Sequence, residues 1–220
     1  MLAAGVAGWA RLGAGPARPV PVSTPPVDEE EEEPAPVEEA PAPPRPETPE
    51  EFGARILRTL AESASQPPEA REAAVSAMID FSSLSPAAFG EAWGLFSAEQ
   101  RAVATRDLRA LLVAQTLQGA RAWLPLAPHL TAVHEDGTKA RVETHALRER
   151  EDIDVQLHVA RRRDAGGLAV VDVEVEGVST VRALQREFER VLAKNDRDLD
   201  YLLTRLARKV ARLRAEAAAP

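Results

Sequence analysis

Histidine is the residue type in this chain best suited to binding a metal or moving a proton near neutral pH. The four histidines, His129, His134, His145 and His158, fall on or beside segments that predict strands. His145 and His158 could be neighbours on adjacent strands, but a metal site needs a third ligand at a fixed spacing, and none is evident. The chain also has no cysteine. The sequence therefore predicts no metal site.

Three acids at alternate positions, Asp172, Glu174 and Glu176, offer a carboxylate pair for acid–base catalysis. Alternation places them in one row on the outward face of a strand, where water would solvate them, so a solvated sheet face is the favoured interpretation. The chain lacks the glycine-rich nucleotide loops, the G-x-S-x-G nucleophile motif and the H-E-x-x-H zinc motif. We expect no catalytic residue, no cofactor and no enzyme activity.

The charge of the chain is concentrated near its N-terminus. Residues 1–50 hold ten acidic and three basic side chains, which account for −7 of the net charge of −8. The remainder is close to neutral, which argues against the broad basic face that nucleic acid binding needs.

The same composition suggests the domain boundaries. Residues 1–15 contain an apolar run too short to span a bilayer, and we interpret them as the remnant of a signal peptide or as a leader. Residues 16–50, rich in Pro, Ala, Val and Glu, predict a disordered acidic linker. Residues 51–214 form the predicted folded domain, and residues 215–220 a disordered tail.

The first half of that domain has the spacing of helices. Apolar residues four apart from Phe52 to Leu60 predict one helix, "QPP" ends it, and a second runs over 69–79. Ser85 and Pro86 predict the start of a short helix that carries Phe89 and Trp93. A capping box at 97–100 predicts a long helix to about residue 122.

In the second half of the domain, apolar and polar residues alternate, which is typical of strands. Four segments joined by short turns predict an antiparallel meander with one apolar and one wet face; its apolar positions include Leu130, Val133, Ala140, Val142, Thr144, Ala146, Ile153, Val155, Leu157 and Val159. The apolar phase slips near Val170, which predicts a bulge or register change there.

Two amphipathic helices end the chain, the first capped by Ser179 or Thr180. The basic end of the second could be a membrane-surface patch, but complementing the helix dipole is the favoured explanation. The predicted fold class is α+β, a curved antiparallel sheet of about four strands wrapped by helices. Patterning alone leaves open whether its apolar interior is filled or hollow.

The stretch "VVDVEVEGVSTVRALQREFERVL" resembles the last strand and following helix of the toluene-tolerance family, the MlaC type of periplasmic phospholipid-binding proteins. The matching positions are Asp172, Val173, Glu176, Gly177, Ser179 and Phe188. Upstream, Trp93 and the run from Ser97 to Arg101 are similar to the family's pattern, and "LDYLLTRLARKV" resembles its closing helix. The family usually has an aromatic residue in place of Leu168, and Asn-Tyr-Arg in place of residues 183–185, which bears on the ligand's headgroup contacts.

The resemblance implies a cone-shaped, NTF2-like fold that encloses a pocket for acyl chains. It implies a monomeric, non-catalytic carrier in the periplasm of a Gram-negative bacterium. The expected ligand is a phospholipid, and the expected partners are an inner-membrane ABC-type lipid transport complex and an outer-membrane lipoprotein/porin complex. Such transport, in either direction, would serve outer-membrane lipid asymmetry. The alternatives are an interaction module with a solid core and a carrier of another hydrophobic ligand.

The resemblance and the apolar pattern together predict which residues line the pocket, although ordinary core packing explains each equally well. The tight strand-to-helix join would place two walls side by side, with Gly177 permitting the turn and Ser179 capping the helix. The predicted lining residues are Phe89, Trp93, Leu111, Val142, Val155, Leu157, Val171, Val173, Val175, Leu184, Phe188, Leu192 and Leu203.

Overall fold

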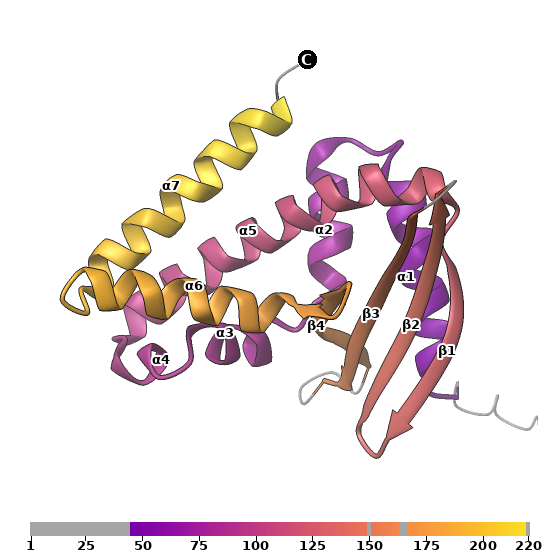
Figure 1. The fold of residues 1–220 in the computed structure, drawn as a ribbon, viewed down its shortest axis with the longest axis horizontal. Coiled ribbons are helices and arrows are strands. Elements are labelled where there is room, and N and C mark those ends of the chain that lie inside the picture. The colour runs from indigo at the N-terminus through magenta and orange to yellow at the C-terminus, as the bar shows by residue number, and fades with distance from the viewer. Residues whose placement is uncertain (1–44, 149–150, 163–166, 219–220) are drawn as a thin grey trace, which may run out of the picture. The chain divides into compact units, whose positions relative to one another are not determined.

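The computed structural model of the protein describes residues 45–148, 151–162 and 167–218 (Figure 1). The predicted leader, residues 16–44 of the predicted linker and residues 219–220 of the predicted tail lie outside these ranges. The described elements are α1 (Pro49–Ser63), α2 (Pro68–Met78), α3 (Phe81–Phe89), α4 (Ala92–Leu95), α5 (Ala98–Trp123), a 3₁₀ turn (Leu124–Leu126), β1 (His129–Asp136), β2 (Lys139–Arg148), β3 (Glu151–Arg161), β4 (Leu168–Val175), β5 (Val178–Ser179), α6 (Thr180–Lys194) and α7 (Leu199–Ala218).

Side-chain caps set the starts of the two principal helices in the first half. The Ser97 hydroxyl accepts from the backbone N–H of Gln100 at 3.1 Å, and the Gln100 side chain accepts from the Ser97 N–H at 3.0 Å. This capping box, predicted from the sequence, opens α5. Thr48 and Glu51 form a second capping box at α1, which therefore begins inside the predicted linker. At the other end, α7 continues beyond residue 214.

The start of α3 differs from the prediction. The helix begins at Phe81 rather than at Ser85, because the Asp80 carboxylate accepts from the backbone N–H groups of Ser82 and Ser83. Pro86 thus lies inside the helix, where it removes one backbone hydrogen bond. Phe89 and Trp93 belong to separate helices, since α3 ends at Phe89 and α4 begins at Ala92.

A curved antiparallel sheet with the strand order β1-β2-β3-β4-β5 forms the other half of the fold (Figure 1). The predicted turn before Thr138 joins β1 to β2, and a two-residue β5 extends the predicted meander. One face of the central strands is apolar; its members are Ala140, Val142, Thr144 and Ala146 on β2 and Ile153, Val155, Leu157 and Val159 on β3.

The predicted bulge near Val170 is confirmed. Val170 pairs with Val159, but Asp172 pairs with His158, so Val171 is an extra residue in β4. The bulge resets the alternation so that Val173 and Val175 pair with Leu157 and Val155, on the apolar face. Val171 was expected to point inward with them; it is instead the bulged residue and is half-buried.

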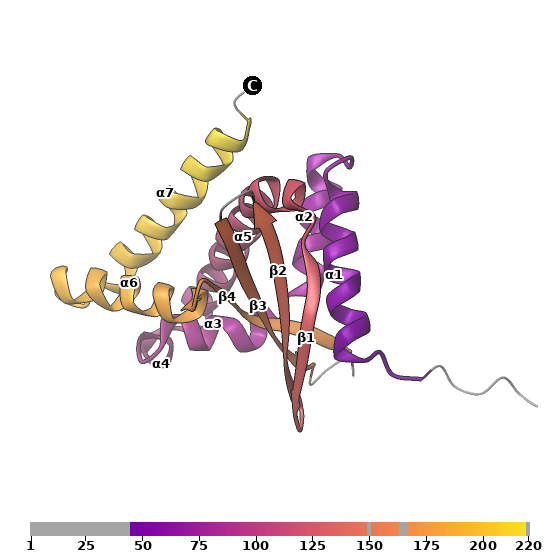
Figure 2. The same ribbon diagram turned by 45° about the vertical axis from the view of Figure 1, so that its right-hand side comes forward.

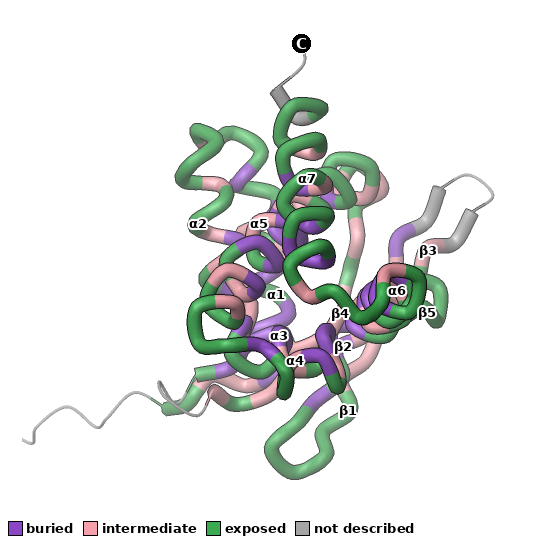
Figure 3. Tube along the Cα trace, turned by 90° about the vertical axis from the view of Figure 1, so that its left-hand side faces the viewer, coloured by how far each residue is buried: buried purple, intermediate pink, exposed green. Residues whose placement is uncertain are grey.

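Helices pack against the sheet and against one another to form the core. Figure 2 shows α1 alongside β1 at the edge of the sheet. The close approach depends on Gly53, because a Cβ at that position would lie 2.7 Å from Val142 Cγ1 and 2.9 Å from Leu130 Cδ1. On the other side of the core α7 packs on α5 and is buried along one side and exposed along the other (Figure 3). None of the described helices has the length and hydrophobicity needed to cross a membrane.

Candidate functional site

A cavity of about 630 Å³ lies between the sheet and the helices. This volume is typical of small-molecule sites, which hold about 300–1,000 Å³. Its wall is mostly apolar; the apolar members are Ile56, Leu60, Val75, Met78, Ile79, Leu84, Leu112, Ala120, Ala122, Trp123, Ile153, Val155, Leu157, Val170, Val173, Val175, Val178, Ala183 and Leu184. The interior that patterning left undecided is therefore hollow in this region.

The cavity wall includes exposed residues on two sides, which mark its mouth. On one side the side chains of Val175 and Val178, at the ends of β4 and β5, are 41% and 53% exposed although both are apolar. On the other side α5 contributes Gln115 and Gly119, which are also exposed. An added Cβ on Gly119 would meet no atom within 4 Å. The mouth thus has open space and apolar groups in contact with solvent.

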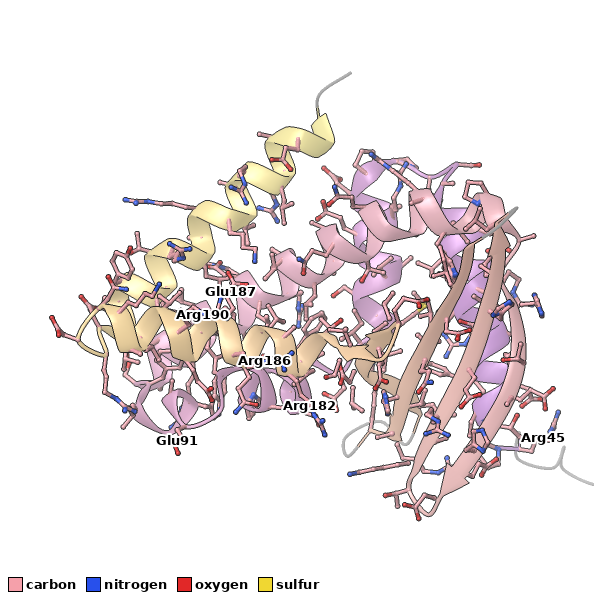
Figure 4. All side chains as sticks on the ribbon, in the orientation of Figure 1. Arg45, Glu91, Arg182, Arg186, Glu187 and Arg190 are labelled. Atoms are coloured by element: carbon pink, nitrogen blue, oxygen red, sulfur yellow. The ribbon has the colours of Figure 1, made fainter. Side chains whose placement is uncertain are left out.

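A charged pair joins α6 to α7 in the same wall. The Lys209 ammonium donates to both carboxylate oxygens of Glu187, at 2.9 and 3.2 Å. Their side chains are 28% and 37% exposed, so the pair is partly desolvated. Figure 4 shows Glu187 on the side of α6 toward α7.

The third charged residue of the wall, Asp172, connects β4 to α6. Its carboxylate accepts from the Ser179 hydroxyl at 2.5 Å and from the Val181 N–H at 3.0 Å. Ser179 itself caps α6 by accepting from Arg182 N–H. A carboxylate at a helix N-terminus is favoured by the exposed N–H groups there. Asp172 was expected to be solvated; it is half-buried and holds two walls of the cavity together.

The strand reaches the helix through a tight hairpin. Val175 pairs with Val178, and the two residues between them, Glu176 and Gly177, have φ values of 49° and 74°. Two successive left-handed residues are typical of the two-residue turns that match strand twist. Glycine adopts this conformation without strain, so Gly177 lets the chain pass directly from one wall of the cavity to the next.

The MlaC protein family model matches residues 52–208, more than half of the chain. The chain belongs to the MlaC family. Among solved structures, it is similar to a phospholipid-binding protein from Ralstonia solanacearum determined in complex with a phospholipid, with a TM-score of 0.61 and 16% sequence identity over 74% of this chain and 94% of that one. A search of curated proteins found no match.

The structure places five of the predicted lining residues in the cavity wall of this MlaC-family chain: Val155, Leu157, Val173, Val175 and Leu184. The rest lie elsewhere. Phe89 stacks on Phe188 at a centroid distance of 4.7 Å and on Trp93 at 6.0 Å. Leu111, Val142, Leu192 and Leu203 are buried in the core, and Val171 is the bulged residue. The cavity meets only the first half of α6, while the second half packs in the core.

Sequence reasoning missed the contribution of α1, α2 and the C-terminal half of α5. The signal that could have revealed it is the group of small residues Gly119, Ala120 and Ala122 before Trp123, since small side chains on a helix leave room in front of it. Ile56 and Leu60 had no such signal, because their spacing is that of any buried helix face.

The histidines form pairs with acids on the sheet. His145 Nδ1 lies 2.8 Å from an Asp154 oxygen, and His158 Nε2 lies 3.4 Å from a Glu174 oxygen. The register pairs His145 with Asp154 rather than bringing it beside His158, so that predicted proximity is wrong. Across residues 45–148, 151–162 and 167–218 there is no group of three ligands suited to a metal.

Proposed function

We propose that this MlaC-family chain binds a phospholipid by enclosing its acyl chains in the apolar cavity. The observation that carries the proposal is the 630 Å³ cavity itself, which has an apolar wall and exposed valines at its mouth. Family membership supports it, as does the shared fold with a protein solved in complex with a phospholipid.

The energetics of lipid transfer require enclosure. Two chains of 16 carbons expose roughly 30 methylenes, and at about 0.8 kcal/mol each their contact with water costs about 25 kcal/mol. A shallow groove would leave much of that cost in place. A cavity whose wall comes from the sheet and from helices on several sides can offset a larger share of it. The headgroup would stay at the wet mouth.

The cavity is suited to carriage rather than catalysis. Its two carboxylates are engaged in structural contacts, Asp172 with the start of α6 and Glu187 with Lys209. We therefore propose a monomeric, non-catalytic carrier that moves lipid between inner-membrane and outer-membrane complexes in the periplasm. Since no nucleotide-binding motif occurs in the sequence, the driving force would come from those complexes or from a lipid gradient.

Native mass spectrometry of the full chain tests this proposal. The chain would be secreted to a bacterial periplasm behind a cleavable signal, and bound lipid would be extracted and identified. We expect adducts of phospholipid mass at a ratio near one to one on a monomer. A clean ligand-free mass, together with no uptake of lipid from vesicles, would show that the cavity serves no lipid and would favour an interaction module.

The carrier role needs a second assay. Donor and acceptor vesicles are held on opposite sides of a membrane that passes the protein but not vesicles, and labelled phospholipid is followed. We expect transfer in proportion to protein concentration. Lipid binding without transfer would support the binding proposal and contradict the carrier role.

A further inference from the structure

Lys209 is the single cationic residue in the cavity wall formed by the described part of the chain. It projects from α7 where the wall also contains Thr180 and Ala183 of α6. A lysine beside an apolar space is expensive to keep charged unless it is paired. The nearby Glu187 provides that pairing, with one carboxylate oxygen 2.9 Å from the Lys209 ammonium.

The ion pair with Glu187 does not use all the hydrogen-bond donors of Lys209. An ammonium group has three N–H donors and no acceptor. Two of the Lys209 donors are directed to the two oxygens of Glu187, at 2.9 and 3.2 Å. Within the described residues, no further acceptor contacts Lys209. A second anion can therefore bind the same ammonium without breaking the first contact.

We propose that Lys209 binds the phosphate of the lipid whose acyl chains occupy the cavity, with Glu187 holding the ammonium in position when the cavity is empty. This inference rests on the proposed function. It assigns the ligand's polar end to the part of the cavity wall formed by α6 and α7. It also predicts a preference for lipids with a phosphate over uncharged lipids with the same tails.

The helix that carries Glu187 also carries exposed positive charge. Three arginines at a spacing of four, Arg182, Arg186 and Arg190, follow α6, and Figure 4 shows them along that helix. All three are exposed, and none has an acidic partner within 4 Å among the ion pairs of the described residues. They add positive charge to the helix that carries Glu187, so the local potential is less negative than the two carboxylates of the wall alone would make it.

Substituting Lys209 and Glu187 in turn distinguishes phosphate binding from a purely structural role of this ion pair. Lys209→Met keeps most of the aliphatic stem and removes the charge, and we expect it to weaken binding of phosphatidylglycerol roughly tenfold. Glu187→Gln removes the competing anion and should strengthen that binding several-fold. If the pair merely latched α6 to α7, both substitutions would change lipid binding in the same direction.

The experiment measures binding of phosphatidylglycerol and of diacylglycerol with identical acyl chains to the full chain, by transfer from vesicles. Lys209→Met should weaken phosphatidylglycerol binding more than diacylglycerol binding, and Lys209→Arg should restore phosphatidylglycerol binding. Lys194→Met is the matched control, because Lys194 is an exposed lysine of α6 outside the cavity wall. Thermal unfolding of each variant verifies that the fold is intact.

The outcomes distinguish this inference from the proposed function. Equal losses for both lipids, or no effect of Lys209→Met on either, would overturn the phosphate site while the lipid cavity stands. No binding of either lipid by the unsubstituted chain would overturn both. Inorganic phosphate is a separate probe: if it binds as tightly as the lipid, and Lys209→Met abolishes its binding, the site takes free phosphate and the lipid assignment is wrong.

Discussion

Replacing Gly119 with leucine should block the cavity without damaging the fold. Gly119 lies on α5 in the cavity wall and is exposed, and an added Cβ would meet no atom within 4 Å. A glycine inside a helix costs about 0.8–1 kcal/mol relative to alanine, and leucine is nearly as good a helix former as alanine. We therefore expect Gly119→Leu to raise the free energy of unfolding by up to about 1 kcal/mol.

The same substitution should weaken lipid binding strongly. The leucine side chain adds four carbon atoms, and if these occupy the room of about four lipid methylenes, the lost burial is about 3 kcal/mol. That difference corresponds to roughly 100-fold in the dissociation constant. Stability and binding would thus move in opposite directions, which distinguishes a blocked cavity from a damaged fold.

Two measurements and one control check this reasoning. Urea unfolding gives the stability, and titration with a fluorescent phospholipid gives the dissociation constant. Gly119→Ala is the control, because it should give the same gain in stability with little effect on binding. A folded Gly119→Leu variant that binds lipid as the unsubstituted chain does would refute the position of the mouth. A fall in stability would refute the claim that the space in front of Gly119 is open.

Substitutions at three further positions test the architecture, each by urea unfolding. Gly53→Ala should lower the free energy of unfolding by about 1–3 kcal/mol, since the new Cβ would overlap Val142; unchanged stability would contradict that contact. Asp172→Ala should lower the free energy of unfolding by about 2 kcal/mol, and Asp172→Asn should lower it less, because the amide oxygen can still accept hydrogen bonds. Equal losses for the two variants would contradict the hydrogen-bonding role of Asp172. Burial acts to raise the pKa of Asp80, but hydrogen bonds from Ser82 and Ser83 outweigh it and hold the pKa below 3.8. The ionised Asp80 therefore stabilises the fold above about pH 4, and this stabilisation is lost as the pH falls through the folded pKa. Asp80→Asn should therefore flatten the acid limb of the stability curve, and an unchanged limb would contradict this assignment.

The elements of this fold were predictable where a local signal determines them. The capping box at Ser97 and the phase slip near Val170 each identified a feature that the structure confirms. The start of α3 was not, because a Ser-Pro pair and an Asp-x-Ser-Ser cap both predict a helix start. The Asp80 cap forms in the structure, and a contact distant in sequence, from the Asp80 N–H to the Val170 carbonyl at 2.9 Å, holds Asp80 in place.

The cavity wall was only partly predictable, because periodicity identifies residues that face inward and says nothing about what lies in front of them. Val173 and Phe188 have the same inward signal. Val173 faces open space in the cavity, whereas Phe188 stacks on Phe89. The difference depends on the relative positions of helices that are far apart in the sequence, and those positions follow from packing rather than from local propensity.

The packing of α7 on α5 has a consequence for how the protein folds. The two helices are separated in the chain by the whole sheet and by α6, so this contact joins distant segments. Until it forms, the side of α5 that packs against α7 stays uncovered. Contacts between distant segments form slowly, and exposed apolar surfaces invite aggregation during that interval. The species most prone to aggregate are therefore those in which α7 has not yet packed on α5.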